Sequence, residues 1–242
     1  MRVMNQTKDS AEIYISGTII DDEESNWKKF WNDGDTTGYQ FPADLKQQLD
    51  ALEDKDLTIY INSYGGSIAA GVAMAHMLER HKGKTTAIVD AYCCSIATQI
   101  FFSADVCKMP SNAWLMLHKP TALLGGDADE MRKAADVLDT LQEGLEVVYG
   151  KKAADGLTAE DIHEMVNAET WLTGKQAAEK FQIELLDSTP ILNCVGNMEK
   201  LRAMGAKNIP PSLNFLPEDK SRPPQEDILK IEIALARAKG VI

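Results

Sequence analysis

Positive charge is scarce in this sequence. Its 242 residues include 25 Lys and Arg against 37 Asp and Glu, which gives a formal net charge of −12. A protein that coats phosphate groups needs a surplus of Lys and Arg, so this balance argues against a nucleic acid or an anionic membrane as a partner. Long apolar runs are absent too, because no stretch approaches the roughly 18 apolar residues of a membrane helix. We therefore expect a cytoplasmic protein rather than an exported or membrane-inserted one.

Cysteine is also scarce. The cysteines show neither the density of a disulfide framework nor the C-x-x-C spacing of a metal site, which indicates a reducing compartment and no structural metal. Adjacent Cys93 and Cys94 are predicted to be buried as small apolar residues. The Gly-Lys-Thr triplet at 83–85 lacks the glycine that a phosphate-binding loop needs at the position of Leu78, so no nucleotide or other cofactor is expected. The four cysteines are Cys93, Cys94, Cys107 and Cys194.

Strand and helix patterns alternate along the chain, which favours an α/β fold. Apolar residues make up 44% of the sequence, enough for one sizeable core. We expect a polar, Trp-containing loop over 21–39 and a turn over 90–94. Strands are predicted at 13–15, 58–62, 85–89, 106–109 and 114–118. Helices are predicted at 67–80, 95–103 and 127–149, and further helices begin at Pro42 and after the N-caps Thr158 and Thr173.

The helix predicted over 127–149 is long and amphipathic. Its apolar residues recur at steps of three and four, and Gly150 ends it. Such a stripe would stay in water unless a second subunit covered it, so we expect a homo-oligomer. The apolar positions are Met131, Ala134, Leu138, Leu141, Leu145 and Val148.

The composition changes after Asp187. Prolines punctuate the chain from there to a predicted helix at 225–239. We interpret 1–187 as the folded domain and 188–242 as a C-terminal appendage.

Two features of the sequence are suited to nucleophilic catalysis. Gly65 and Gly66 directly follow a predicted strand, where their backbone N–H groups can approach a developing negative charge with no side chain in the way. Ser95 lies at a turn-to-helix junction, from which its hydroxyl can project while the N–H of Ile96 faces the same charge. A tight turn and a helix N-cap are the alternative interpretations of the glycines and of Ser95.

A serine hydroxyl needs a positioned base, and the sequence has four histidines. His76, His81 and His163 lie on or beside predicted helices and are interpreted as surface or packing residues. His118 instead ends a predicted strand, at the sheet edge where active sites of open α/β folds gather. It is the candidate base, with a hydrogen-bonded structural histidine as the alternative.

Three segments that follow one another in the chain share one resemblance. They are 59–71 (IYINSYGGSIAAG), 90–97 (DAYCCSIA) and 109–120 (MPSNAWLMLHKP). In that order they resemble the YINSPGG segment, the nucleophile turn and the histidine segment of the Clp protease proteolytic subunit family, ClpP. The similarity extends over about 11–187.

The resemblance implies a serine endopeptidase with Ser95 as nucleophile, His118 as general base, and the N–H groups of Gly66 and Ile96 as oxyanion hole. It also implies the fold of that family, a spiral of ββα units shared with crotonases, with a long protruding helix that contributes to contacts between rings. Because the family's rings enclose their active sites, the expected partners are further copies of this chain and polypeptide substrates. A separate AAA+ ATPase unfoldase or phage capsid proteins are the further partners that the resemblance implies.

Some positions depart from the family pattern. Tyr64 replaces a proline and Cys93-Cys94 replaces two alanines, which alters packing without removing a reactive group. The family carries an aspartate two residues before an aromatic-Leu-Ser/Thr helix start, and the segment ETWLT puts Glu169 in that place. A glutamate can orient an imidazole, but its extra methylene demands a different backbone distance. A solvated loop carboxylate is the alternative interpretation of Glu169.

Substrate and function keep alternatives at this point. Three features are more similar to phage and prophage members of the family, including head maturation proteases, than to the housekeeping subunit: the ETWLT segment, the early start and the appendage. Capsid or scaffold proteins and general unfolded chains are therefore both open as substrates. A crotonase-like acyl-CoA enzyme would use paired N–H groups on a thioester oxyanion, and a catalytically silent ring or scaffold subunit would need no chemistry. The presence of both Ser95 and His118 argues against each.

Overall fold

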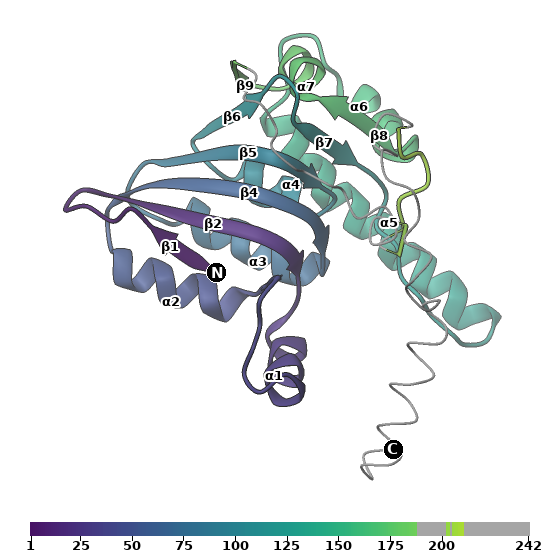
Figure 1. Ribbon diagram of the computed structural model, residues 1–242. Helices are drawn as coiled ribbons and strands as arrows, with labels where there is room; N and C mark the ends of the chain where they lie inside the picture. Colours follow the sequence, from purple (N-terminus) through teal and green to yellow (C-terminus); the bar gives the residue numbers. More distant parts are fainter. Residues whose placement is uncertain (188–201, 204, 211–242) are drawn as a thin grey trace, which may run out of the picture. The chain divides into compact units, whose positions relative to one another are not determined.

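In the computed structural model, which describes residues 1–187, 202–203 and 205–210, the centre of the protein is a nine-stranded mixed sheet (Figure 1). Its main path runs β1-β2-β4-β5-β6-β9, and every neighbouring pair along it is parallel except β1 with β2. These residues belong to one compact unit, Met1–Pro210. The strands are β1 Arg2–Met4, β2 Ser10–Ile19, β3 Tyr39–Gln40, β4 Asp56–Gly66, β5 Thr85–Cys94, β6 Val106–Pro110, β7 Trp114–Leu117, β8 Thr170–Thr173 and β9 Ile183–Leu186.

Helices cover one face of the parallel strands (Figure 1). In β4 the side chains of Leu57, Ile59 and Ile61 are buried, while the residues between them face the other side, as the two-residue period of a strand requires. The predicted α/β fold is thereby confirmed. The helices are α1 Asp22–Trp31, α2 Pro42–Leu52, α3 Ile68–Glu79, α4 Ala97–Phe102, α5 Ala128–Lys151, α6 Ala159–Asn167 and α7 Gly174–Lys180.

Strand β5 changes neighbours along its length, and this corrects the predicted turn at 90–94. The first half of β5 pairs with β6, whereas Tyr92, Cys93 and Cys94 pair with β7. The register with β4 shifts between these halves, so the strand bends rather than ends. Cys93 and Cys94 are fully buried, as predicted, and burial raises the pKa of both thiols. Pairing and burial therefore override the turn signal of the local sequence.

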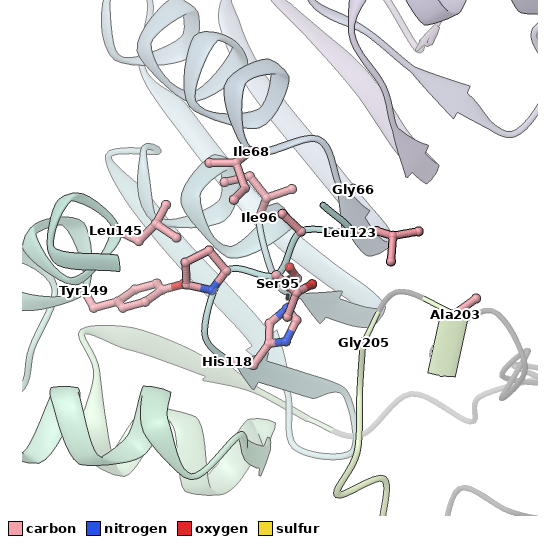
Figure 2. Close-up of a pocket in the computed structure, with 13 residues that line it drawn as sticks. Gly66, Ile68, Ser95, Ile96, His118, Leu123, Leu145, Tyr149, Ala203 and Gly205 are labelled. Atoms are coloured by element: carbon pink, nitrogen blue, oxygen red, sulfur yellow. Dashed lines mark hydrogen bonds between the residues drawn. The ribbon is translucent and has the colours of Figure 1, made fainter. Parts of the chain in front are cut away.

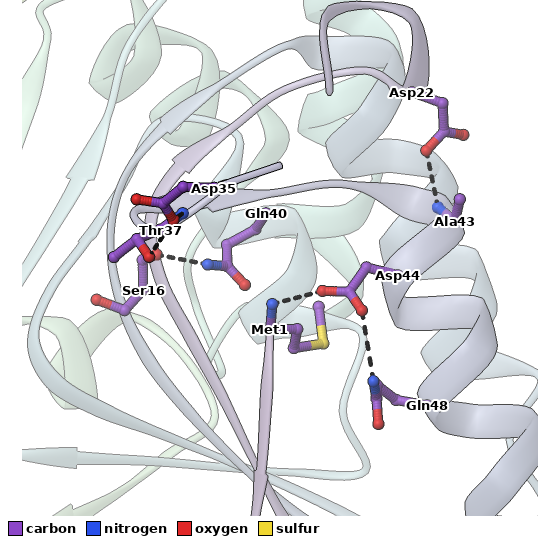
Figure 3. Close-up of polar contacts among 9 residues, drawn as sticks. All are labelled: Met1, Ser16, Asp22, Asp35, Thr37, Gln40, Ala43, Asp44 and Gln48. Carbon is purple, nitrogen blue, oxygen red and sulfur yellow. Dashed lines mark hydrogen bonds and ion pairs between the residues drawn. The ribbon is translucent and has the colours of Figure 1, made fainter. Parts of the chain in front are cut away.

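The segment 21–39 is not a loop throughout, because it contains α1. The side chain of Asp21 caps this helix by accepting the Glu24 N–H at 2.7 Å, with acidic residues in the first turn and lysines in the last. Figure 3 shows how the chain then returns to the sheet: Gln40 donates to the Ser16 carbonyl at 2.8 Å, and Asp22 accepts the N–H of Ala43 at 2.9 Å. The short strands β1, β3, β8 and β9 were not predicted either.

Helix α5 continues through Gly150, which was predicted to end it, to Lys151, because the glycine does not break the helix here. Asp127 and Glu130 form a capping box at its start. Its first half is exposed, whereas Gln142 and Tyr149 in the second half are buried against the core. The long helix of the resemblance is thus present, and its buried residues lie in its C-terminal half.

The two shorter helices begin where the sequence predicted. Thr158 and Thr173 both cap them with reciprocal capping boxes. The predicted helix at 225–239 and Cys194 lie outside the described residues, and the domain boundary at 187 stays a prediction. Within the described residues, no helix combines the length and the apolar character needed to span a bilayer.

Candidate active site

Ser95 lies in the tight turn between β5 and α4. Its backbone has φ +55°, a left-handed conformation that is strained for a residue with a side chain. The Ser95 N–H donates to the Met116 carbonyl of β7 at 2.9 Å, which pins the turn to the neighbouring strand. The N-cap residue of α4 is Ile96, and it has no side-chain cap. The Ser95 hydroxyl is therefore free of the capping role that was its alternative interpretation.

His118 follows directly after β7 and faces Ser95. Its Nε2 lies 2.8 Å from the Ser95 Oγ, a hydrogen-bond distance between residues 23 positions apart (Figure 2). Two other histidines have partners away from this site: His81 Nε2 lies 2.7 Å from the Lys55 carbonyl, and His163 pairs with Glu146 on α5. The structure thus brings together the two side chains that the sequence selected.

The protonation of His118 is governed by two opposing effects. Burial lowers the pKa of its imidazole from the ordinary value, and the negative charge of Glu169 raises it in part. Burial is the larger effect, so the environment favours the neutral form of the imidazole. A neutral ring whose Nε2 faces a serine hydroxyl is in the state that a general base needs.

Glu169 lies beside His118 because of strand register. Strands β7 and β8 are antiparallel with Leu117 opposite Thr170, so the residues just beyond each strand end, His118 and Glu169, are neighbours. Glu169 also has a left-handed backbone, at φ +51°. Within the described part of the chain its carboxylate accepts hydrogen bonds from amides and from the Trp171 indole at 3.3 Å, and it acts on the imidazole through its charge.

The Gly65-Gly66 pair lets the end of β4 approach the serine turn closely. A Cβ on Gly65, whose φ is +98°, would lie 2.7 Å from the Ser95 Cβ and 2.8 Å from the Cys94 carbonyl oxygen. A Cβ on Gly66 would lie 1.9 Å from the Ile19 carbonyl oxygen. Gly66 and Ile96 line the same pocket as Ser95. Gly65 and Gly66 lie inside β4, paired with Thr18 and Ile19 of β2, so they neither follow the strand, as predicted, nor form a tight turn. The close approach to the serine turn is what requires glycine here.

The pocket around Ser95 and His118 has a volume of about 380 Å³ (Figure 2). Ile68, Leu145 and Tyr149 line it together with Leu123 and with Ala203 and Gly205 from the chain beyond the last strand. The residues 203 and 205 were not predicted, because nothing local in the sequence indicates a contact across so many positions. An apolar wall beside a hydroxyl and an imidazole suits a substrate side chain next to the reacting bond.

A buried hydroxyl pair connects α5 to the serine turn. Thr98 Oγ1 donates to the Ser95 carbonyl at 2.6 Å and lies 2.8 Å from the Tyr149 hydroxyl. Burial raises the pKa of Tyr149 to about 12, so its hydroxyl stays protonated. Sequence reasoning placed Val148, not Tyr149, on the buried face of α5. No group of three His, Cys, Asp or Glu side chains in the described residues is arranged to hold a metal ion.

Known proteins resemble this chain over the part that carries the site. A family model described as Clp protease matches residues 39–183, more than half of the chain. The ATP-dependent Clp protease proteolytic subunit 2 of Bifidobacterium longum (strain NCC 2705) is 27% identical over 154 residues, which are 62% of this chain and 72% of that protein. The ATP-dependent Clp protease proteolytic subunit of Streptococcus pyogenes serotype M5 (strain Manfredo) is 30% identical over 149 residues, 59% of this chain and 75% of that protein.

Proposed function

This chain belongs to the Clp protease family, and from that premise we propose that it is a serine endopeptidase with Ser95 as nucleophile and His118 as general base. The observation that carries the proposal is the 2.8 Å contact between the Ser95 Oγ and His118 Nε2, at a strained turn inside a pocket. Strained backbone at a nucleophile is a known way of presenting a hydroxyl to a substrate.

Each proton in the proposed reaction has a defined donor and acceptor. The Ser95 Oγ attacks the peptide carbonyl carbon while His118 Nε2 takes the hydroxyl proton. The N–H groups of Gly66 and Ile96 stabilise the resulting oxyanion. His118 then gives the proton to the leaving amine, which breaks the C–N bond and leaves an acyl group on Ser95. A water molecule attacks this ester, again losing a proton to His118, and the proton returns to Ser95 as the acid product leaves.

We propose Glu169 as the third member of this constellation. Its charge opposes the lowering of the His118 pKa by burial, which is the effect expected of a carboxylate that stabilises an imidazolium. The register of β7 with β8 supports its place beside the ring.

We propose that the working form is a ring of identical subunits in the cytoplasm. Helix α5 leaves several large apolar side chains exposed to water, and a second copy of the chain is the partner that the family membership favours. The exposed side chains are Met131, Val137, Leu141 and Val147.

The substrates we propose are polypeptide chains that enter the enclosed space. Two finer assignments follow from the family and from the ETWLT segment: unfolded chains delivered by a separate AAA+ ATPase, or phage capsid and scaffold proteins. Digestion of a permanently unfolded protein and of a purified capsid protein, each with and without an unfoldase, distinguishes them.

The decisive experiment combines covalent labelling with two variants. A fluorophosphonate should label Ser95, located by peptide mass spectrometry, and Ser95→Ala and His118→Ala should each abolish peptide hydrolysis while the fold is retained. Ser103→Ala is the matched control, because Ser103 lies at the other end of α4 and donates to the Ile100 carbonyl at 2.8 Å. Hydrolysis by Ser95→Ala at the full rate would contradict the proposal, and a crotonase-like enzyme would give no serine adduct.

A further inference from the structure

The chain returns to the active site after the part that matches the family model. The backbone N–H of Lys207 lies 2.7 Å from both Glu169 carboxylate oxygens, and the N–H of Asn208 lies 2.6 Å from Oε1. The Asn208 side chain also donates to the Ala168 carbonyl at 3.0 Å. This segment lies beyond residue 183, where the family match ends.

The segment makes its contacts with Glu169 through its backbone. The side chains of Lys207 and Asn208 are exposed, whereas the preceding Ala206 is buried. Gly205 has φ +92°, and a Cβ there would lie 3.1 Å from the Thr121 Oγ1. Figure 2 shows Ala203 and Gly205 on the side of the pocket that also carries Leu123. Residues 205–208 are therefore seated between the pocket wall and Glu169.

A glutamate in this place needs to be held. Its side chain has one more rotatable bond than an aspartate and is only partly buried here, so a lone Glu169 could turn its charge into solvent. Hydrogen bonds from N–H groups to a carboxylate are of the strong, charge-assisted kind. Two such donors on one carboxylate fix its position, as the outer partners of catalytic groups commonly do.

We propose that the backbone N–H groups of Lys207 and Asn208 are positioning groups of the active site, which hold the Glu169 carboxylate beside His118. This inference rests on the proposed function and makes it more specific. It assigns residues 205–208 to the catalytic unit, although the sequence placed them in an appendage. The extra methylene of Glu169 moves its carboxylate further from the backbone. The amides that bind this carboxylate come from a segment outside the family match, so the longer side chain is accommodated.

The test removes one N–H group at a time by proline substitution in the full chain. Proline lacks the donor, whereas alanine at the same position keeps it. We expect Lys207→Pro and Asn208→Pro to have kcat at least about tenfold below Lys207→Ala and Asn208→Ala, with KM changed less. The acidic limb of kcat/KM should move to lower pH, because His118 loses part of the charge that raises its pKa.

A second series separates positioning from folding. In a Glu169→Ala background the proline substitutions should cause no further loss, because the carboxylate that they release is gone. Gly205→Val should act in the same direction as the prolines, since its side chain would press on Thr121 and lift the segment while leaving both N–H groups in the chain. Melting temperature and native mass establish that each variant is folded and assembled.

The outcomes are distinct. Proline variants that are folded, with the kcat and pH profile of their alanine counterparts, would overturn the inference. An equal loss in the Glu169→Ala background would overturn it as well, because the segment would then act on the fold. Ser95→Ala is assayed beside them: an inactive Ser95→Ala with silent prolines removes only this inference, whereas an active Ser95→Ala removes the proposed function.

Discussion

Gly65→Ala adds one methyl group at the closest backbone approach in the active site. An alanine at φ +98° lies outside the regions allowed to residues with a side chain, which costs about 1–2 kcal/mol. The new Cβ would lie 2.7 Å from the Ser95 Cβ and 2.8 Å from the Cys94 carbonyl oxygen, and such overpacking costs about 1–3 kcal/mol. We therefore expect a loss of about 2–5 kcal/mol in unfolding free energy.

The same substitution should reduce catalysis by more than it reduces the folded fraction. Relief of the clash pushes the Ser95 turn away from β4, and a displacement near 1 Å costs about a hundredfold in rate. The assay is kcat for a fluorogenic peptide, with the melting temperature measured in parallel. Gly144→Ala is the control, because its Cβ would meet nothing within 4 Å and alanine favours a helix by about 1 kcal/mol over glycine. A Gly65→Ala protein with wild-type kcat and melting temperature would refute the reasoning.

Three further variants test the site and the assembly. Glu169→Gln should move the acidic limb of kcat/KM to lower pH, because the charge that raises the His118 pKa is lost, while the control Asp161→Asn should leave the limb in place. A shift of the limb to higher pH in Glu169→Gln would contradict the proposed effect of Glu169 on His118. Val137→Glu should dissolve the ring in native mass spectrometry and lower activity with Ser95 intact, and an active monomeric wild type would exclude the ring. Tyr149→Phe should lower unfolding free energy by about 1 kcal/mol through the lost contact with Thr98, measured by denaturant titration, and an unchanged midpoint would show that the contact contributes nothing.

The reactive pair could be predicted from sequence because its signals are local. Ser95 and His118 each sit where a strand ends, and parallel neighbours bring such ends to one edge of a sheet. The five predicted strands, now β2, β4, β5, β6 and β7, and the capped helices were found for the same reason, since their periodicity and caps involve residues a few positions apart. The 2.8 Å contact between the Ser95 Oγ and His118 Nε2 thus joins two residues that local sequence signals had each identified.

The features that were missed depend on distant partners or on competing local signals. The turn predicted at 90–94 is strand because β7 supplies hydrogen bonds to Cys93 and Cys94. Helix α1 had a readable cap at Asp21, but its mixture of Trp, Lys and Asp gave no clear apolar stripe. The amides of 207–208 meet Glu169 across almost forty positions, and a backbone N–H leaves no trace in the sequence.

Helix α5 is a stiff element whose C-terminal end packs against the active site and whose N-terminal part is exposed to water. Its 24 residues span about 36 Å at 1.5 Å per residue. Tyr149 at one end touches Thr98, which holds the Ser95 carbonyl, while Met131 and Val137 at the other end project into water. A tilt imposed on the far end is carried along the helix to the nucleophile, since an unbroken helix has no hinge within its hydrogen-bonded ladder. Neighbouring subunits that bind the free end of α5 would thus determine how firmly Ser95 is held in position. In an isolated subunit the nucleophile would be held less firmly.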